Sequence, residues 1–242
     1  MQFASKCRNT WHHHYLQVAY AEPWRAVAEQ ARLAAEEART DGEVRVAAAP
    51  DQATSGVKRF GTGNIYEGEF SGGKMHGFGV YRWPTGHIYE GEWAEGRRQG
   101  SGVFVSPGGE VYQGAWDADQ RQGQGASKQS FGGFYYGSWG NNKRDGEGCL
   151  EMQDGAVYNG MFKQGKMCGV GWHQYAKGAL YEGDFLNDKK HGQGVYWYLS
   201  GAVYEGGWEN DEKHGRGKIW YPDGRIVAGD WATGNEASVE EM

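Results

Sequence analysis

Histidine and cysteine are the side chains best suited to metal binding or nucleophilic chemistry, and neither type is grouped into a recognisable site. His12–His14 are consecutive and could hold a metal, but no matching set of ligands accompanies them, so we predict no metal site. Cys7, Cys149 and Cys168 lie far apart and are odd in number, which favours a reducing interior over secretion. This set of residues does not predict a catalytic centre.

Glycine-rich loops are a common way to hold phosphate groups, and glycine supplies 42 of the 242 residues. Pairs of the form Gly-x-Gly recur, as in Gly77 and Gly79, yet none extends into GxGxxG or GxxxxGK(S/T). The sequence also lacks a nucleophile elbow and a paired-histidine metal motif. We therefore expect no enzymatic activity and no cofactor.

Basic side chains at predicted turns form the first candidate site, which we call the basic ridge. They would line one edge of a sheet and contact an acidic filament tail or anionic lipid headgroups. The alternative is a solvated surface that keeps an aromatic-rich sheet soluble. The basic ridge comprises Lys74, Arg97, Arg98, Arg121, Lys143, Arg144, Lys166, Lys189, Lys190 and Lys213.

Aromatic side chains in the C-terminal part of the chain form the second candidate site, which we call the aromatic groove. A groove of this kind would accept a partner helix or an extended peptide. The alternative is that these large side chains compensate for the open end of a sheet. The aromatic groove comprises Tyr175, Tyr196, Trp197, Tyr198, Trp220 and Tyr221.

A repeat of 23 residues must position both sets. Tyr66 recurs as tyrosine at every 23rd residue through Tyr204, with glycine two residues later and Phe or Trp four residues later. Alternate residues of a β-strand share a face, so these three residues lie on one face. A Gly-x-Gly pair opens a second strand, which predicts a β-hairpin in each unit. We expect the strand glycines to leave flat backbone against which the aromatic side chain of the neighbouring unit packs.

Stacking of these hairpins is required for stability, because one hairpin alone is marginal in water. The predicted fold is mainly β: an elongated single antiparallel sheet of stacked hairpin repeats, with one N-terminal α-helix. The array contains a half unit, seven full units and a partial eighth. The expected organisation is an irregular segment at 1–22, an amphipathic Ala-rich helix at 23–41, a linker at 42–55, the repeat array at 56–234 and an acidic tail at 235–242.

The predicted helix begins with Pro23, which suits the first turn, and ends before Gly42. Its apolar residues, among them Trp24 and Val27, recur at i, i+3 and i+4 spacing. Two roles fit such a helix. It covers the first edge of the sheet, or it pairs with a second helix in a homodimer or a partner.

The segments YEGEFSGGKMHGFGVYRWPTGHI at 66–88 and YEGDFLNDKKHGQGVYWYLSGAV at 181–203 resemble the MORN (membrane occupation and recognition nexus) repeat. The family's usual His-Gly pair is present at His76, His191 and His214 and is altered in the units between them. The resemblance implies a non-catalytic scaffold for protein–protein interactions in a cytoskeletal or axonemal assembly. An alternative that the family also implies is a peripheral membrane module that binds anionic phospholipids.

Charge and hydropathy limit the classes of partner that we expect for this chain. The net charge of −6 argues against nucleic acid, because phosphate binding needs a clustered surplus of Lys and Arg. No run of 18 apolar residues and no signal-peptide core is present, which favours a cytoplasmic chain. We therefore expect protein partners and association with the cytoskeleton, in a cilium or flagellum or at another site, with anionic membrane as the alternative.

Overall fold

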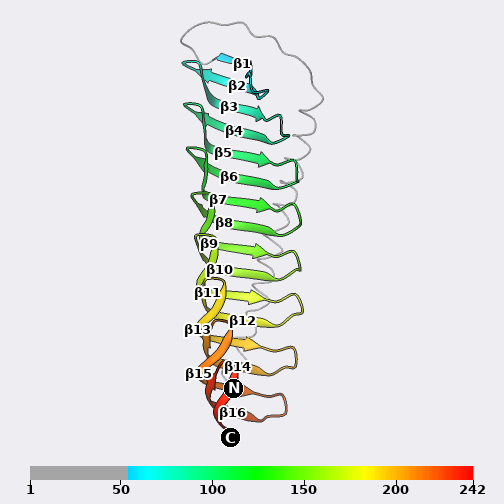
Figure 1. Cartoon of the computed structure of the whole chain (residues 1–242), viewed down its shortest axis with the longest axis vertical. Helices are drawn as coiled ribbons and strands as arrows, with labels where there is room; N and C mark the ends of the chain where they lie inside the picture. Colours follow the sequence, from blue (N-terminus) through cyan, green and yellow to red (C-terminus); the bar gives the residue numbers. More distant parts are fainter. Residues whose placement is uncertain (1–53, 242) are drawn as a thin grey trace. The chain divides into compact units, whose positions relative to one another are not determined.

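The computed structural model describes residues 54–241, which form β-strands joined by short turns (Figure 1). The chain divides into two compact units, Met1–Gln113 and Gly114–Met242, which we call the N-terminal and C-terminal units. Every strand pairing within each unit is antiparallel and joins strands that are consecutive in the chain. The predicted mainly-β fold of stacked antiparallel hairpins is therefore confirmed.

Short strands of seven residues alternate with longer strands of nine. The N-terminal unit contains β1 (Thr54–Arg59), β2 (Ile65–Ser71), β3 (Lys74–Arg82), β4 (Ile88–Ala94) and β5 (Arg97–Val105), and β6 (Val111–Asp117) crosses the boundary. The C-terminal unit contains β7 (Gln120–Lys128), β8 (Phe134–Gly140), β9 (Lys143–Glu151), β10 (Val157–Lys163), β11 (Lys166–Gln174), β12 (Leu180–Leu186), β13 (Lys189–Trp197), β14 (Val203–Glu209), β15 (Glu212–Trp220), β16 (Ile226–Ala232) and β17 (Asn235–Glu241).

The tight turn inside each hairpin needs positive φ at both central residues. Asn141 and Asn142 adopt φ of 50° and 67°, and the corresponding Asp188 adopts 71°. Two-residue turns with this geometry match the right-handed twist of the strands that they join, and Asn, Asp and Gly tolerate it best. Asn142 and Asp188 therefore adopt the backbone conformation that their residue types favour.

The strand register places glycines opposite one another. Gly68 of β2 pairs with Gly79 of β3, which pairs with Gly91 of β4. The same pattern runs through the C-terminal unit, where Gly183, Gly194 and Gly206 are successive partners. A continuous row of backbone without side chains, which we call the glycine row, therefore crosses several strands of each unit.

The tyrosine of the same hairpin covers this glycine row, which corrects the expectation that the neighbouring unit's aromatic residue would do so. A Cβ atom added to Gly79 would collide with the ring of Tyr66, and one added to Gly194 would collide with Tyr181. The neighbouring hairpin contributes a hydrogen bond instead: Trp93 Nε1 donates to the carbonyl oxygen of Gly79 at 3.2 Å. The sequence period could not distinguish these two neighbours, because both recur at the same interval.

The tyrosine hydroxyl also fixes the irregularity in each hairpin. The register shifts after Gly68, and the Tyr66 hydroxyl donates to the carbonyl oxygen of Glu69 in this bulge at 2.8 Å. The Tyr181 hydroxyl makes the equivalent bond to Asp184 at 3.0 Å. A buried hydroxyl thus satisfies a carbonyl that the bulge removes from the normal ladder.

An alternating series of aromatic rings forms the core. Tyr181 is fully buried and contacts two rings edge to face. The centroid of its ring lies 5.1 Å from that of Phe185 in the same hairpin and 5.3 Å from that of Trp208 in the next hairpin. Tyr66 has the same relation to Phe70 and Trp93, at 5.0 Å and 5.4 Å. Each tyrosine therefore connects two successive hairpins, which is how stacking stabilises units that are marginal alone.

The ends of the chain differ from the expected organisation in one respect. Residues 235–241 form β17, which pairs with β16, whereas the sequence suggested only an acidic tail at 235–242. This strand lacks the tyrosine and glycine signature, so the repeat period did not predict it. The segments 1–22 and 23–41, with the expected Ala-rich helix, lie outside the described residues, as does most of the 42–55 linker.

Candidate functional site

The basic ridge divides into two rows on opposite faces of the strands, because consecutive residues of a strand point in opposite directions. The first residue of each pair is exposed, as in Lys189, and the second is partly buried against aromatic rings, as in Lys190. The outward row is Lys74, Arg97, Lys143, Lys166 and Lys189, and the inward row is Arg98, Arg121, Arg144, Lys190 and Lys213. The ridge predicted from the sequence is therefore not one surface.

The inward row covers the aromatic core. Lys190 Nζ lies 4.5 Å from the ring centroid of Trp208, 5.0 Å from Tyr196 and 5.7 Å from Tyr175. Lys213 Nζ lies 3.8 Å from the Trp231 centroid. Burial lowers the pKa of the Lys190 ammonium, an effect that Asp211 opposes. Cation–π contacts of about 0.5–2 kcal/mol each make this row part of the packing.

The outward row is exposed and partly engaged with the following turn. Lys74 forms an ion pair with Glu95 at 2.6 Å, and Lys143 Nζ donates to Gln164 Oε1 at 3.0 Å. Hydrogen bonding to Lys74 lowers the pKa of the Glu95 carboxyl. Exposed pairs of this kind contribute little to stability, so the outward row is best regarded as a charged surface.

The aromatic groove is also divided by strand alternation. Trp197 and Trp220 face away from the core tyrosines, and the cross-strand partners of Trp197 are Leu180 and Val203. The other four side chains, Tyr175, Tyr196, Tyr198 and Tyr221, lie on the core-tyrosine face, which we call the inner face. The structure joins Tyr175, Tyr196 and Tyr198 through ring contacts, places Tyr221 one repeat further along, and separates the two tryptophans from this set.

Three of the inner-face tyrosines stand on identical turns. The backbone N–H of Tyr175 donates a hydrogen bond to the carbonyl oxygen of Ala179 at 2.9 Å. The N–H of Gly178 donates to the carbonyl oxygen of Tyr175 at 2.8 Å. Tyr198 makes the same bond to Ala202 at 2.9 Å, and Tyr221 makes it to Arg225 at 2.9 Å. These backbone bonds hold each aromatic side chain in a defined position at the edge of the inner face. We call this set the tyrosine ladder: Tyr175, Tyr198 and Tyr221.

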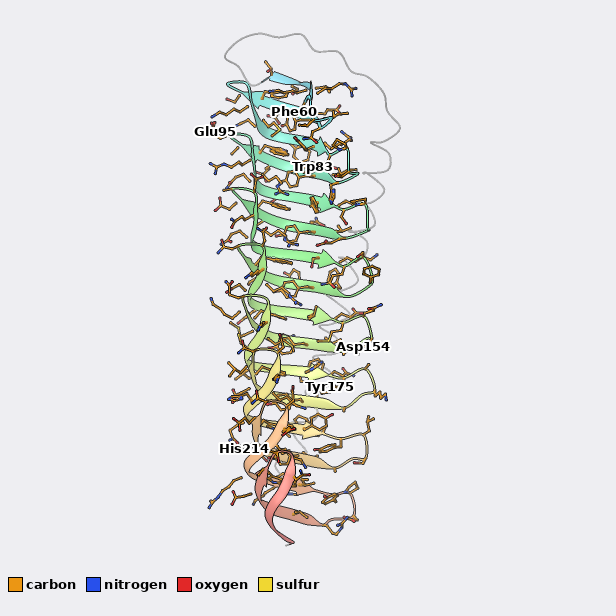
Figure 2. The ribbon with its side chains drawn as sticks, viewed as in Figure 1. Phe60, Trp83, Glu95, Asp154, Tyr175 and His214 are labelled. Atoms are coloured by element: carbon orange, nitrogen blue, oxygen red, sulfur yellow. The ribbon has the colours of Figure 1, made fainter. Side chains whose placement is uncertain are left out.

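A second aromatic cluster lies in the N-terminal unit and was missing from the groove predicted from the sequence. Trp83 lies 4.5 Å from Tyr81 and 6.2 Å from Phe104, and Phe60 lies 5.8 Å from Tyr81, between ring centroids. Figure 2 labels Phe60 and Trp83 in this unit and Tyr175 in the C-terminal unit. The signal was available, because Phe60 and Trp83 occupy the repeat position of Tyr175, Tyr198 and Tyr221. We call this set the N-terminal cluster: Phe60, Tyr81, Trp83, His87 and Phe104.

His173 occupies a tyrosine position inside the C-terminal unit. Its cross-strand partners are Tyr158 and Tyr181, and its ring lies 4.3 Å from that of Tyr175. The side chain is buried, and Nε2 has no hydrogen-bond partner among the described residues. Burial and the nearby Lys190 charge lower the pKa of this imidazole.

Acidic and cysteine side chains could also supply reactive groups, but those described below accept backbone hydrogen bonds or are buried. Glu69 and Asp184 accept hydrogen bonds from the backbone N–H groups of Phe78 and Gln193, at 3.0 Å and 2.9 Å. Burial raises the pKa of the Cys149 thiol to about 11, which makes it a poor nucleophile near neutral pH. Within residues 54–241 no group of three or more His, Cys, Asp or Glu side chains could hold a metal. In the same range no helix has the length and apolar character to cross a membrane.

Solved structures provide distant matches. The TCP domain of SAS-4 from Drosophila melanogaster, in complex with a proline-rich motif of Ana2, is 12% identical with a TM-score of 0.40, and the match covers 79% of this chain and 100% of that chain. The G-box domain of the microcephaly protein CPAP is 12% identical with a TM-score of 0.45, over 78% of this chain and 97% of that one. Similarity at this level does not extend to function. No curated protein sequence matches the chain significantly.

The family model named MORN repeat matches the chain seven times in succession. The matched segments are 66–88, 89–111, 112–126, 135–157, 158–180, 181–203 and 204–224, which together exceed half of the chain. They coincide with the hairpins whose tyrosines, glycines and tryptophans form the core. The chain therefore belongs to the MORN repeat family.

Proposed function

We propose that this MORN array is a non-catalytic scaffold that binds protein partners, in a cytoskeletal or axonemal assembly of the cytoplasm. The observation that carries the proposal is the set of partly exposed aromatic side chains on the inner face. They stand on backbone turns at the spacing of the repeat. Partly exposed aromatic residues held in fixed positions are typical of protein-binding surfaces, where Tyr and Trp contribute most of the binding energy.

The chemistry of the inner face supports a protein partner over a small-molecule substrate. Its polar groups are tyrosine hydroxyls, the cations of the inward row and the imidazole of His173, which is buried, and the Lys190 ammonium is already in contact with several rings. A catalytic site would require acid–base or nucleophilic groups next to one another in a pocket. Cys149, whose thiol pKa is raised by burial, does not fit that role.

Anionic phospholipid is the second candidate ligand, and the outward row is the observation that favours it. Lys166 and Lys189 are exposed on successive long strands, β11 and β13. Stable attachment to a membrane generally needs a second signal besides a few basic residues. We therefore place this function behind protein binding.

Two parallel assays on the full chain test the proposal: pelleting with microtubules, and flotation with liposomes that contain phosphoinositides, both at physiological salt. We expect pelleting without flotation. Lys166→Glu combined with Lys189→Glu should leave pelleting largely intact if the inner face binds, whereas Tyr175→Ser combined with Tyr198→Ser should abolish it. Flotation that the lysine variant abolishes, in the absence of pelleting, would replace the scaffold by the membrane module.

A further inference from the structure

The tyrosine ladder has hydroxyl groups that the fold itself does not use. The hydroxyl groups of the core tyrosines Tyr158 and Tyr204 donate hydrogen bonds to the carbonyl oxygens of Met161 and Gly207, at 3.0 Å and 2.9 Å. By contrast, the hydroxyls of Tyr175, Tyr198 and Tyr221 make no hydrogen bond within residues 54–241. Each ladder ring is also partly exposed. The ladder therefore presents aromatic surface together with unused hydrogen-bond donors.

The spacing of the ladder selects the conformation of a ligand that runs along it. Successive ladder residues are one hairpin apart, and two strand separations of about 4.8 Å give about 9.6 Å. A polyproline II helix rises about 3.1 Å per residue with three residues per turn, which gives about 9.3 Å per turn. An extended β-strand repeats about every 6.8 Å, which does not match the ladder, and two turns of an α-helix give about 10.8 Å, a poorer match than polyproline II.

The chemistry of the ladder fits the same ligand. A polyproline II segment has no internal hydrogen bonds, so its carbonyl groups are free to accept from the tyrosine hydroxyls. Burial raises the pKa of Tyr175 and Tyr198, which keeps both hydroxyls protonated and able to donate at neutral pH. Proline rings stack against exposed aromatic side chains in grooves that recognise such segments.

Charges near the ladder disfavour a basic ligand. The Arg225 guanidinium lies 4.5 Å from the Tyr221 ring centroid, and Lys190 Nζ lies 5.7 Å from that of Tyr175. These cations already occupy part of the ring surface that a lysine or arginine of a partner would use. Acidic side chains lie near the same rings, because Asp223 pairs with Arg225 at 2.8 Å and Asp211 helps to raise the pKa of Tyr175. A neutral segment therefore fits the ladder best.

We propose that the tyrosine ladder binds a proline-rich segment of a partner protein in the polyproline II conformation, with prolines three residues apart along the successive hairpins. This inference rests on the proposed scaffold function and names the kind of segment that the scaffold recognises. Exposed Leu199, which follows Tyr198, extends the apolar surface beside the ladder.

Fluorescence anisotropy with labelled peptides tests the proposal on the full chain. The probe is a peptide of four Pro-Pro-Ser triplets. Its controls are a peptide of the same length with three Pro-Pro-Ser-Ser repeats, in which the proline pairs recur every four residues, and an amphipathic Leu/Glu helix. We expect binding of the triplet peptide and at least tenfold weaker binding of both controls. Equal binding of the spacing control, or preference for the helix, would overturn the proposal.

Substitutions locate the site. Tyr198→Phe keeps the ring and removes the hydroxyl, so affinity should fall roughly three- to tenfold, the effect of one hydrogen bond. Tyr175→Ser combined with Tyr198→Ser should abolish binding, whereas Trp220→Ser on the opposite face should leave it unchanged. Circular dichroism and thermal unfolding establish that each variant is folded. Unchanged binding in the folded double variant would place the peptide elsewhere.

The two proposals fail in different ways. If the triplet peptide does not bind while microtubule pelleting persists, the scaffold remains and the ladder loses its assigned ligand. If the peptide binds and pelleting is absent, the recognition of proline-rich segments stands and the cytoskeletal partner is wrong.

Discussion

The N-terminal cluster and the tyrosine ladder use the same positions of the repeat and present different surfaces. In the N-terminal unit, Phe60 and Trp83 occupy the turn position, and Met75 and Arg98 stand at the repeat position of Lys190. The ladder instead supplies hydroxyl groups, and Lys190 lies over the rings beside it. The backbone template is common to both units. The comparison teaches that the variable turn position of each hairpin decides whether its inner face presents a tyrosine hydroxyl or the ring of a phenylalanine or tryptophan.

Between these regions the turn position carries no aromatic side chain. Ser106, Gln129 and Met152 occupy it in successive repeats. The core continues through these repeats, since Tyr112, Tyr135 and Tyr158 remain buried. The positions that build the fold and the positions that shape its surface therefore vary independently.

Removing a core tyrosine should have the largest effect and the same effect in both units. Tyr66→Ala and Tyr181→Ala each delete a fully buried ring that touches two aromatic neighbours and covers the glycine row. We expect each to lower the free energy of unfolding by about 3–5 kcal/mol. Chemical denaturation of the full chain measures the loss in each variant. A much smaller loss in one unit would show that the two do not share a template.

Charge reversal separates the inward row from the outward row. Lys190→Glu places a carboxylate against the negative faces of several rings, and should lower the free energy of unfolding by about 2–3 kcal/mol. Lys189→Glu, one residue earlier, remains in solvent and should change it by less than about 0.5 kcal/mol. Denaturant titration of the two variants side by side is the measurement. Equal losses would mean that both lysines belong to one surface.

Adding a methyl group to the glycine row tests the contact that the tyrosines make. Gly79→Ala and Gly194→Ala introduce a Cβ atom into the ring of Tyr66 or Tyr181, and each should cost about 1–3 kcal/mol of stability. Gly61→Ala is the matched control, since a Cβ atom there meets no atom within 4 Å. Thermal unfolding compares all three. If Gly61→Ala lost as much stability as the other two variants, the loss would be due to backbone effects rather than to the ring contact.

Acid should affect the C-terminal unit through His173, and the effect should be smaller than those above. Burial and Lys190 hold the pKa of His173 below its ordinary value of about 6.5, so the unfolded chain takes up this proton first. The stability due to neutral His173 is complete above that value and is lost as the pH falls below it.

His173→Tyr restores the residue type found at the equivalent Tyr81 and Tyr196. The variant should lose less stability than the original chain between pH 7 and pH 5, as measured by urea unfolding at several pH values. The other histidines are common to both proteins, so parallel pH profiles would show that His173 does not contribute.

The sequence alone determined the repeat and the hairpin. Tyrosine, glycine and tryptophan at intervals of two residues predict one face of a strand, and Asn, Asp and Gly at fixed positions predict the turns. These are local properties, since a side chain's face and a turn's φ angles depend on residues close in the chain.

The division of both candidate sites was also within reach of the sequence. Lys189 and Lys190 are consecutive in one strand, and so are Tyr196 and Trp197. Consecutive strand residues point to opposite faces, so the same alternation that predicts the core separates the members of each pair. Grouping these residues by type alone, without their strand positions, placed side chains of two faces in one predicted site.

The tertiary structure alone decided what meets what across the strands. It showed that the tyrosine of the same hairpin covers the glycine row, that Lys190 lies among rings from successive hairpins, and that residues 235–241 add a strand without the repeat signature. These features depend on register, and a bulge after Gly68 and its equivalents shifts that register within each hairpin. A period of 23 residues gives every repeat position the same set of neighbours, but only the hydrogen-bonded register determines which of those neighbours are in contact.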